Sequence, residues 1–259
     1  MFVYIGIDIG SRNTKLAVLD AVSGKLIYDD MLTTGMNPQQ TAKDILKQAF
    51  VALNYTPDSV NKLYCTGYGR NLMPSDKTVS EINCHAQGVL YFYPEAKTII
   101  DIGGQDSKVI SIGTNNHVKD FVMNDKCAAG TGRFLEMVAL RLEISCAELS
   151  DIAQTAGQTH TLSSTCVVFA ETEIISLITK GLTSAEIIRA VNNSISSRIV
   201  TQVNQLDWLS PVVFTGGVAL NHDLKILMEQ QLNCSILTPP NPEITGALGA
   251  AILAMRENV

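Results

Sequence analysis

The polar and apolar positions of the chain follow two periods in turn, which predicts strands and helices along its whole length. Apolar runs of strand length occupy residues 3–7, 16–19, 62–65, 98–100, 109–112, 118–123, 212–215 and 235–237. Segments of helical pattern or length occupy residues 38–53, 80–91, 132–142, 168–180, 184–206, 221–231 and 246–255. Ser80 and Ser184 are the expected N-caps of two of these helices. Strands alternating with helices predict an α/β fold.

One octet of residues occurs twice within this pattern. Residues 8–15 read Asp-Ile-Gly-Ser-Arg-Asn-Thr-Lys, and residues 101–108 read Asp-Ile-Gly-Gly-Gln-Asp-Ser-Lys. Each octet lies between two apolar strands, so each predicts a β-hairpin with a tight polar turn. Matched hairpins indicate two lobes of common design. We expect an N-terminal lobe over residues 1–95, with residues 245–259 packing back on it, and a C-terminal lobe over residues 96–244.

Both hairpin turns have the residues that phosphate binding requires. A phosphate needs backbone N–H donors at close range, which glycine permits because it has no side chain in the way. The candidate ligands are Gly10, Ser11, Arg12, Asn13, Thr14 and Lys15 in the first turn and Gly103, Gly104 and Gln105 in the second. The strand-end carboxylates suit Mg²⁺ held partly through water, so the candidate catalytic residues are Asp8 and Asp101. One copy would favour an ordinary Asp-capped turn, whereas two copies favour a nucleotide.

A third glycine segment completes the expected nucleotide site. The apolar strand at residues 212–215 runs into Gly216 and Gly217, and Asn221 opens the helix that follows. A glycine pair lets the backbone lie against a flat base or ribose, and a helix N-terminus offers unpaired N–H groups. Gly132, at the start of a predicted helix, and Glu243, after a double proline, are further candidates for contact with ATP.

Composition narrows the class of protein. The chain has 259 residues, of which 46% are hydrophobic and 17% charged, so it can bury a large core and is not extensively disordered. A net charge of -6 argues against nucleic acid as the main partner. No apolar run approaches the ~20 residues that cross a bilayer, and the N-terminus lacks a signal-peptide pattern. We therefore expect a cytoplasmic protein that does not contact membranes.

Two of the six cysteines lie in distinctive segments. Cys127 belongs to the segment NDKCAAGTGRF and Cys166 to SSTCVVFAE, and each precedes or opens a predicted helix. The dipole of a helix N-terminus favours a thiolate. A [4Fe–4S] cluster takes four thiolates, which a twofold dimer would supply. The alternative is two unrelated buried cysteines, and the residues by themselves favour that alternative.

The order of the motifs resembles a known superfamily. Hairpin, helix, hairpin, Gly-Gly turn and a final small-residue helix are similar to the order in actin, hexokinase and the large heat-shock chaperones. In these proteins two ribonuclease-H-like lobes close over ATP. The resemblance implies an actin-like ATPase fold with a nucleotide cleft between two lobes. It also implies that the segments 80–88 and 245–252 are crossing helices.

A narrower resemblance covers the chain from end to end. The segments NDKCAAGTGRF, SSTCVVFAE, IDIGGQDSKVI, TGYGR and VFTGGVALN resemble the ATPase activators of 2-hydroxyacyl-CoA dehydratases, which are related to ATPase subunits of benzoyl-CoA reductase. This resemblance implies an oxygen-sensitive homodimer with ATP, Mg²⁺ and one [4Fe–4S] cluster bridging the subunits through Cys127 and Cys166. ATP hydrolysis would drive a low-potential electron, received from ferredoxin or flavodoxin, into the dehydratase or a related reductase. The rival expectations are an amino-sugar kinase of the same superfamily and a nucleotide-switched chaperone or filament protein.

Overall fold

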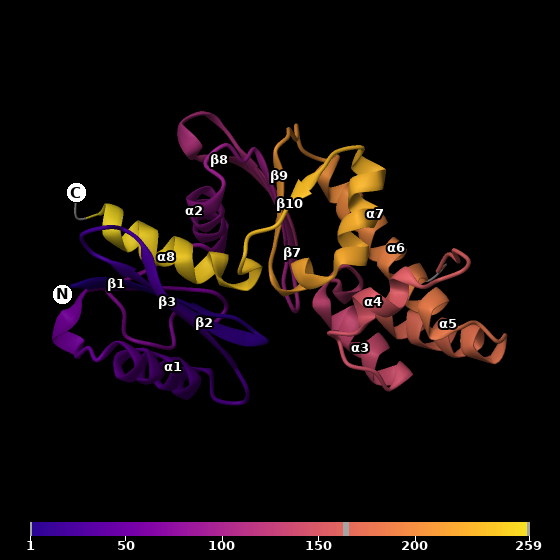
Figure 1. The fold of residues 1–259 in the computed structure, drawn as a ribbon, viewed down its shortest axis with the longest axis horizontal. Helices are drawn as coiled ribbons and strands as arrows, with labels where there is room; N and C mark the ends of the chain where they lie inside the picture. Colours follow the sequence, from indigo (N-terminus) through magenta and orange to yellow (C-terminus); the bar gives the residue numbers. More distant parts are fainter. Residues whose placement is uncertain (1, 163–165, 258–259) are drawn as a thin grey trace. The chain divides into compact units, whose positions relative to one another are not determined.

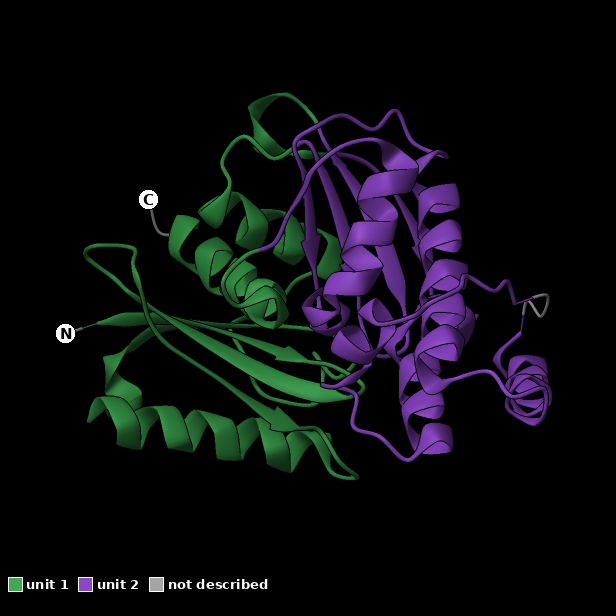
Figure 2. Cartoon of the chain, turned by 45° about the vertical axis from the view of Figure 1, so that its right-hand side comes forward, with its two compact units in different colours: residues 1–96, 113–118, 239–259 green, residues 97–112, 119–238 purple. Residues whose placement is uncertain are grey.

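The chain forms two compact units, each assembled from separated stretches of sequence. The computed structural model describes residues 2–162 and 166–257, so residues 163–165 of the second cysteine segment lie outside the described residues. Unit 1 comprises residues 1–96, 113–118 and 239–259, and unit 2 comprises residues 97–112 and 119–238 (Figure 2). Residues far apart in sequence therefore share a unit.

The sheet of unit 1 has its most buried strand in the middle. Its strand order is β3-β2-β1-β4-β5. The strands are β1 (Val3–Ile9), β2 (Asn13–Asp20), β3 (Leu26–Thr33), β4 (Val60–Thr66) and β5 (Lys77–Thr78). β1 is antiparallel to β2 and parallel to β4. Every residue of β1 is buried, which explains its continuous apolar run.

Helices cover both faces of this sheet (Figure 1). α1 (Pro38–Leu53) packs Ala42, Ile45 and Ala49 against one face. α2 (Glu81–Phe92) and α8 (Thr245–Arg256) pack against each other and α8 covers the opposite face. Glycines allow this close packing, because a Cβ on Gly249 would meet the carbonyl oxygen of Cys84 at 1.7 Å. The two helices that the resemblance pairs therefore pack against each other. The described residues of the unit also form the short 3-10 helices η1 (Pro57–Ser59), η2 (Thr114–Asn116) and η5 (Pro242–Ile244).

The sheet of unit 2 repeats the strand pattern of unit 1. Its order is β10-β9-β6-β7-β8. The strands are β6 (Thr98–Ile102), β7 (Ser107–Ile112), β8 (Val118–Asn124), β9 (Val212–Thr215) and β10 (Ile236–Leu237). β6 is antiparallel to β7 and parallel to β9, as β1 is to β2 and β4. The repeat seen in the octets therefore extends to the topology of the sheets.

One helix of unit 2 differs from the others in how little of it is buried. The helical segments are η3 (Ala128–Gly130), α3 (Gly132–Leu142), α4 (Leu149–Gln154), α5 (Val167–Thr179), α6 (Ser184–Val203), η4 (Gly217–Leu220) and α7 (His222–Leu232). α6 supplies much of the core, with nine of its residues buried. α5 is rich in apolar residues, yet it buries only Ala170 and Ile174. In the part of the chain that the structure describes, no helix is long and apolar enough to cross a membrane.

The predicted α/β class is confirmed, with corrections to individual elements. Ser80 caps α2 by accepting the N–H of Asn83 at 3.4 Å, as expected. The predicted cap at Ser184 is wrong. Thr183 caps α6 instead, because it forms a reciprocal capping box with Glu186. The pattern also missed β3, in which apolar and polar positions are mixed and mostly half-exposed, and α4, which has only six residues.

Candidate functional site

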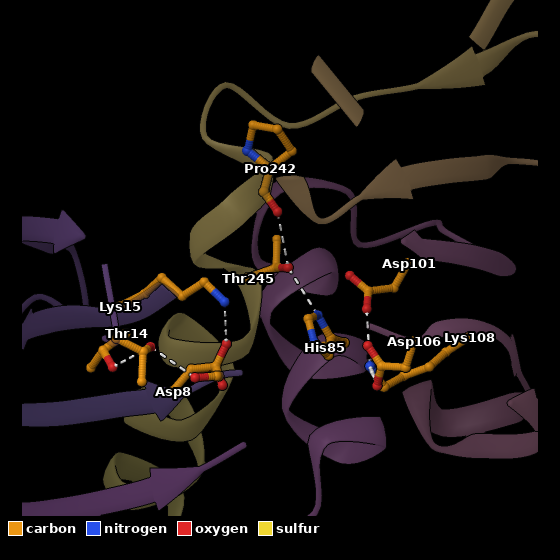
Figure 3. A network of polar contacts seen from close by, with 11 residues as sticks. Asp8, Thr14, Lys15, His85, Asp101, Asp106, Lys108, Pro242 and Thr245 are labelled. Carbon is orange, nitrogen blue, oxygen red and sulfur yellow. Dashed lines mark hydrogen bonds and ion pairs between the residues drawn. The ribbon is translucent and has the colours of Figure 1, made fainter. Parts of the chain in front are cut away.

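The first hairpin, in unit 1, places a buried carboxylate opposite a lysine. Asp8 and Lys15 are direct partners across β1 and β2, and Lys15 Nζ lies 2.9 Å from Asp8 Oδ2 (Figure 3). The N–H of Gly10 donates to the carbonyl oxygen of Asn13 at 3.1 Å and closes the turn. Asp8 is 5% exposed, so its charge acts in a weakly screened environment. The geometry matches the hairpin expected from the octet.

The second hairpin, in unit 2, has the same geometry and one more carboxylate. Asp101 and Lys108 are direct partners, and Gly103 N–H donates to the carbonyl oxygen of Asp106 at 2.9 Å. Lys108 Nζ lies 3.3 Å from Asp101 Oδ2 and 2.7 Å from Asp106 Oδ2 (Figure 3). All three residues are buried, which leaves two carboxylates around one ammonium. Sequence reasoning did not select Asp106, although the repeat aligns it with Asn13.

The predicted phosphate ligands differ in their accessibility. Thr14 is buried, with its hydroxyl 3.0 Å from that of Thr34, and Thr34 donates to the carbonyl oxygen of Gly10 at 2.8 Å. Thr14 therefore supports the turn from within the sheet. The exposed residues at the two tips are Ser11, Arg12 and Gln105, and the half-buried ones are Gly10, Asn13, Lys15, Gly103 and Gly104.

The predicted Gly-Gly turn of unit 2 lies directly against the end of β6. Gly216 has φ +87°, and a Cβ there would lie 2.4 Å from the carbonyl oxygen of Ile102. Only glycine fits this position. Gly217 is exposed. Asn221 is buried and caps α7 by accepting the N–H of Leu224 at 3.0 Å, so its side chain shapes the turn.

Gly132 joins the second hairpin to the segment that carries Cys127. Its N–H donates to the carbonyl oxygen of Gly103 at 2.9 Å, and the N–H of Arg133 donates to that of Gly104 at the same distance. A Cβ on Gly132 would lie 3.2 Å from Gly103 O and 3.3 Å from a methyl of Val218, in η4. Three predicted segments therefore meet within unit 2.

Glu243 belongs to unit 1, in η5, whereas the Gly-Gly turn belongs to unit 2. Burial raises the pKa of the Glu243 carboxyl, and the charge of Lys15 partly opposes this shift. Within its own unit, Glu243 therefore lies in the electrostatic field of the first hairpin.

Cys127 and Cys166 both lie in unit 2, at the starts of helical segments. Cys127 precedes η3 and Cys166 precedes α5, and both are half-exposed. Asn124 holds Cys127 on both sides, since it accepts the Cys127 N–H at 3.0 Å and donates to its carbonyl oxygen at 2.8 Å. Among the described residues, no group of three or more His, Cys, Asp or Glu side chains could hold a metal ion.

Two units, each with a phosphate-type hairpin on a mixed five-stranded sheet, define an ATPase of the actin-like fold. The chain belongs to the BadF/BadG/BcrA/BcrD ATPase family, which matches residues 5–254. Both results confirm what the motifs predicted for the fold and the family.

Named relatives lie close to the chain in sequence and structure. It is 41% identical over 255 residues to the activator of lactoyl-CoA dehydratase of Anaerotignum propionicum, covering 96% of both chains. It is 39% identical over 258 residues to the 2-hydroxyisocaproyl-CoA dehydratase activator of Clostridioides difficile, covering 98% of this chain and 95% of the relative. The solved structure of the activator of the 2-hydroxyisocaproyl-CoA dehydratase from Clostridium difficile with bound ADPNP matches with a TM-score of 0.93 at 36% identity. That match covers 99% of this chain and 95% of the other.

Proposed function

We propose that the chain is an ATP-dependent electron-transfer activator of a 2-hydroxyacyl-CoA dehydratase or a related reductase. In this proposal two copies share one [4Fe–4S] cluster through Cys127 and Cys166. Relatives at 39% and 41% identity are activators of such dehydratases, and one activator is solved with ADPNP. The structural observation that supports the proposal most directly is the backbone link between the second hairpin and the Cys127 segment.

That link gives a physical route from nucleotide to cysteine. The carbonyls of Gly103 and Gly104 accept the first two N–H groups of α3, so a displaced phosphate turn would displace the helix start. Between Cys127 and α3 the chain is short, and Ala129 and Gly130 in it are buried. Packed segments pass on displacements, because protein interiors are dense.

The same proposal assigns roles to the nucleotide residues. Asp8 and Asp101 orient Mg²⁺–ATP, and the backbone and polar side chains of the two hairpin turns bind its phosphates. Gly216 and Gly217 border the adenosine, and Asn221 maintains their turn. Phosphoryl transfer to water needs positioning and charge stabilisation more than covalent chemistry, so Lys15 and Lys108 are suited to support it.

The residues at the cysteines fit a cluster ligand set. Both thiols are half-exposed, and Cys166 precedes the 13-residue helix α5, whose N-terminal dipole favours negative charge. By contrast, Cys65 and Cys84 are buried, and burial raises the pKa of their thiols to about 11 and about 12. Two thiols per chain make up half of the four that a [4Fe–4S] cluster takes. When bound, such a cluster supplies one-electron transfer, and ferredoxin or flavodoxin is the proposed donor.

The apolar surface beside Cys166 supports a second copy as the neighbour. Val168 and Phe169 are 71% and 69% exposed, and Ile175 and Ile178 on the same helix are also exposed. Exposed apolar side chains gathered on one helix favour a protein contact. A copy that shares the cluster would approach α5 at its first turn.

Iron analysis of the anaerobically purified protein tests the proposal. We expect brown protein with about four irons per two chains. Cys127→Ser and Cys166→Ser should each remove the iron and leave ATP binding intact, whereas Cys146→Ser, at an exposed cysteine, should keep it. Iron that survives both substitutions contradicts the ligand assignment. Colourless protein that phosphorylates an amino sugar would favour the kinase alternative.

A further inference from the structure

The turn after β4 in unit 1 has the same local structure as the Gly-Gly turn after β9 in unit 2. Thr66 is the parallel-strand partner of Asp8, and Thr215 is that of Asp101. The next residue is in each case a glycine with left-handed backbone, Gly67 at φ +88° and Gly216 at φ +87°. The structural repeat therefore extends to these two turns, although their sequences, TGYGR and TGGVA, differ after the first two residues.

Both glycines lie against the same atoms of their hairpin. A Cβ on Gly67 would lie 2.5 Å from Asp8 Oδ1 and 2.5 Å from the carbonyl oxygen of Ile9. A Cβ on Gly216 would lie 2.9 Å from Asp101 Oδ1 and 2.4 Å from the carbonyl oxygen of Ile102. Real Cβ atoms essentially never come within 3.0 Å of another heavy atom in this way. Each carboxylate therefore packs directly against the backbone of a glycine, in space that the side chain of any other residue would fill.

We propose that Gly67 is a positioning residue for ATP hydrolysis, which it serves by holding the Asp8 carboxylate in its reactive orientation. The inference rests on the proposed function, in which Asp8 orients Mg²⁺–ATP. Gly216 is its counterpart for Asp101. The turn from Gly67 to Arg70 is thus part of the hydrolytic machinery of unit 1.

The surroundings of Asp8 show why a small displacement matters. Gly67 lies against Oδ1, while Lys15 Nζ contacts Oδ2 at 2.9 Å. Gly246 of α8 also borders Oδ2, because a Cβ there would lie 3.1 Å from it. The carboxylate is therefore bordered on both oxygens, and an added methyl group at Gly67 would move Oδ1 or the turn.

Arg70 holds the turn in place. Its backbone N–H and its guanidinium Nη1 both donate to the carbonyl oxygen of Gly67, at 3.2 and 3.1 Å. Gly69 N–H donates to the carbonyl oxygen of Ile9 at 2.9 Å and ties the turn to the first hairpin. Removing the Arg70 side chain would loosen the turn without adding an atom near Asp8.

The chain offers a matched control for backbone strain. Gly181 has φ +86°, close to that of Gly67, and nothing lies within 4 Å of a Cβ built there. Gly181→Ala therefore carries the same left-handed backbone cost as Gly67→Ala, without a steric contact. Any difference between the two variants reports the contact with Asp8 and Ile9.

The experiment measures steady-state ATP hydrolysis by the full chain against ATP and Mg²⁺, with ADP binding in the absence of Mg²⁺ as the second readout. We expect Gly67→Ala to lower kcat about 100-fold, as a misplacement of about 1 Å can do, and to raise the Mg²⁺ concentration for half-maximal activity. ADP affinity should change much less than kcat, because ADP binding without Mg²⁺ does not use the Asp8 carboxylate. Gly181→Ala should match the wild type in kcat, in the Mg²⁺ concentration for half-maximal activity and in ADP affinity.

A second variant covers the case in which Gly67→Ala does not fold. Arg70→Ala should then lower kcat and raise the Mg²⁺ requirement in the same direction, at unchanged ADP affinity. The inference is overturned if Gly67→Ala behaves like Gly181→Ala, or if Gly67→Ala does not fold and Arg70→Ala matches the wild type. Failure of the proposed function gives a different result. In that case the wild-type protein hydrolyses no ATP, or the Asp8→Asn variant hydrolyses it normally.

Discussion

The backbone N–H of Gly132 donates to the carbonyl oxygen of Gly103 at 2.9 Å, so helix α3 begins on the turn of the second hairpin. Arg133 repeats this contact with Gly104. A helix N-terminus normally leaves such N–H groups without a partner inside the helix. Here they connect the turn expected to bind phosphate with the segment that carries Cys127.

Gly132→Pro is expected to weaken this connection while keeping the helix. Proline is favoured at the first helical position, and Thr131 before it is extended at φ −135° and ψ 170°. The lost hydrogen bond costs about 1 kcal/mol of stability. The proline Cδ also replaces the N–H that lies 2.9 Å from the carbonyl oxygen of Gly103, so the ring pushes the helix start away from the turn. In protein loaded with the proposed cluster, we expect ADPNP to change the electron paramagnetic resonance spectrum, and Gly132→Pro should diminish that change. An undiminished nucleotide response would contradict a route through Gly132, and Gly157→Pro, in an open loop, is the control.

Lys108→Met should destabilise the protein far more than Lys15→Met. Lys108 is 2% exposed and contacts two buried carboxylates, which the substitution leaves without their cation. Breaking a buried pair costs about 3–5 kcal/mol. Lys15 is 18% exposed, so water can compensate more of the lost interaction with Asp8. Denaturant unfolding measures both values, and equal losses would show that burial does not govern these pairs.

Thiol labelling should separate the cysteines by burial. In iron-free protein at pH 8, iodoacetamide should label Cys146 fastest and Cys127 and Cys166 more slowly, since these are exposed or half-exposed. Cys65 and Cys84 should resist, because burial blocks access and raises the pKa of their thiols to about 11 and about 12. Peptide mass spectrometry gives the order of labelling. Early labelling of Cys84 would require that unit 1 opens readily.

Stability should fall as the pH rises above about 9. The thiols of Cys65 and Cys84 have pKa values raised from 9.0 to about 11 and about 12, with burial as the main cause. Above pH 9 the unfolded chain therefore releases protons that the folded chain retains, so the stability present below pH 9 is lost through this window. Urea unfolding at pH 8, 9 and 10 checks the slope. Cys84→Ala should flatten it, and an unchanged slope would assign the effect elsewhere.

Phe169→Asp should weaken self-association and leave the unfolding of the single chain little changed. Phe169 is 69% exposed beside Cys166, so a charge there meets water in a single chain and would meet an apolar surface in the proposed dimer. Val51→Asp on α1, at a residue 75% exposed, is the matched control. Anaerobic sedimentation velocity measures the dimer fraction. A dimer that tolerates Asp at residue 169 would place the contact between copies elsewhere.

Sequence by itself determined the local parts of this protein. The octets at residues 8–15 and 101–108 predicted both hairpins, because a strand, a tight turn and a second strand depend on neighbours in sequence. The helix boundaries were mostly predicted for the same reason, and Ser80 was recognised as a cap from its position alone. Ser184 was not the cap of α6, since the reciprocal bonds between Thr183 and Glu186 outweigh a preference for serine.

Only the tertiary structure decided which distant residues complete the hairpins. Gly67 and Gly216 reach Asp8 and Asp101 because β4 and β9 lie parallel to β1 and β6, and parallel pairing joins segments separated by whole helices. Gly132 contacts Gly103 because the fold of unit 2 places the first residue of α3 against the turn of the second hairpin. No local pattern encodes these contacts, since they depend on packing among elements that fold together.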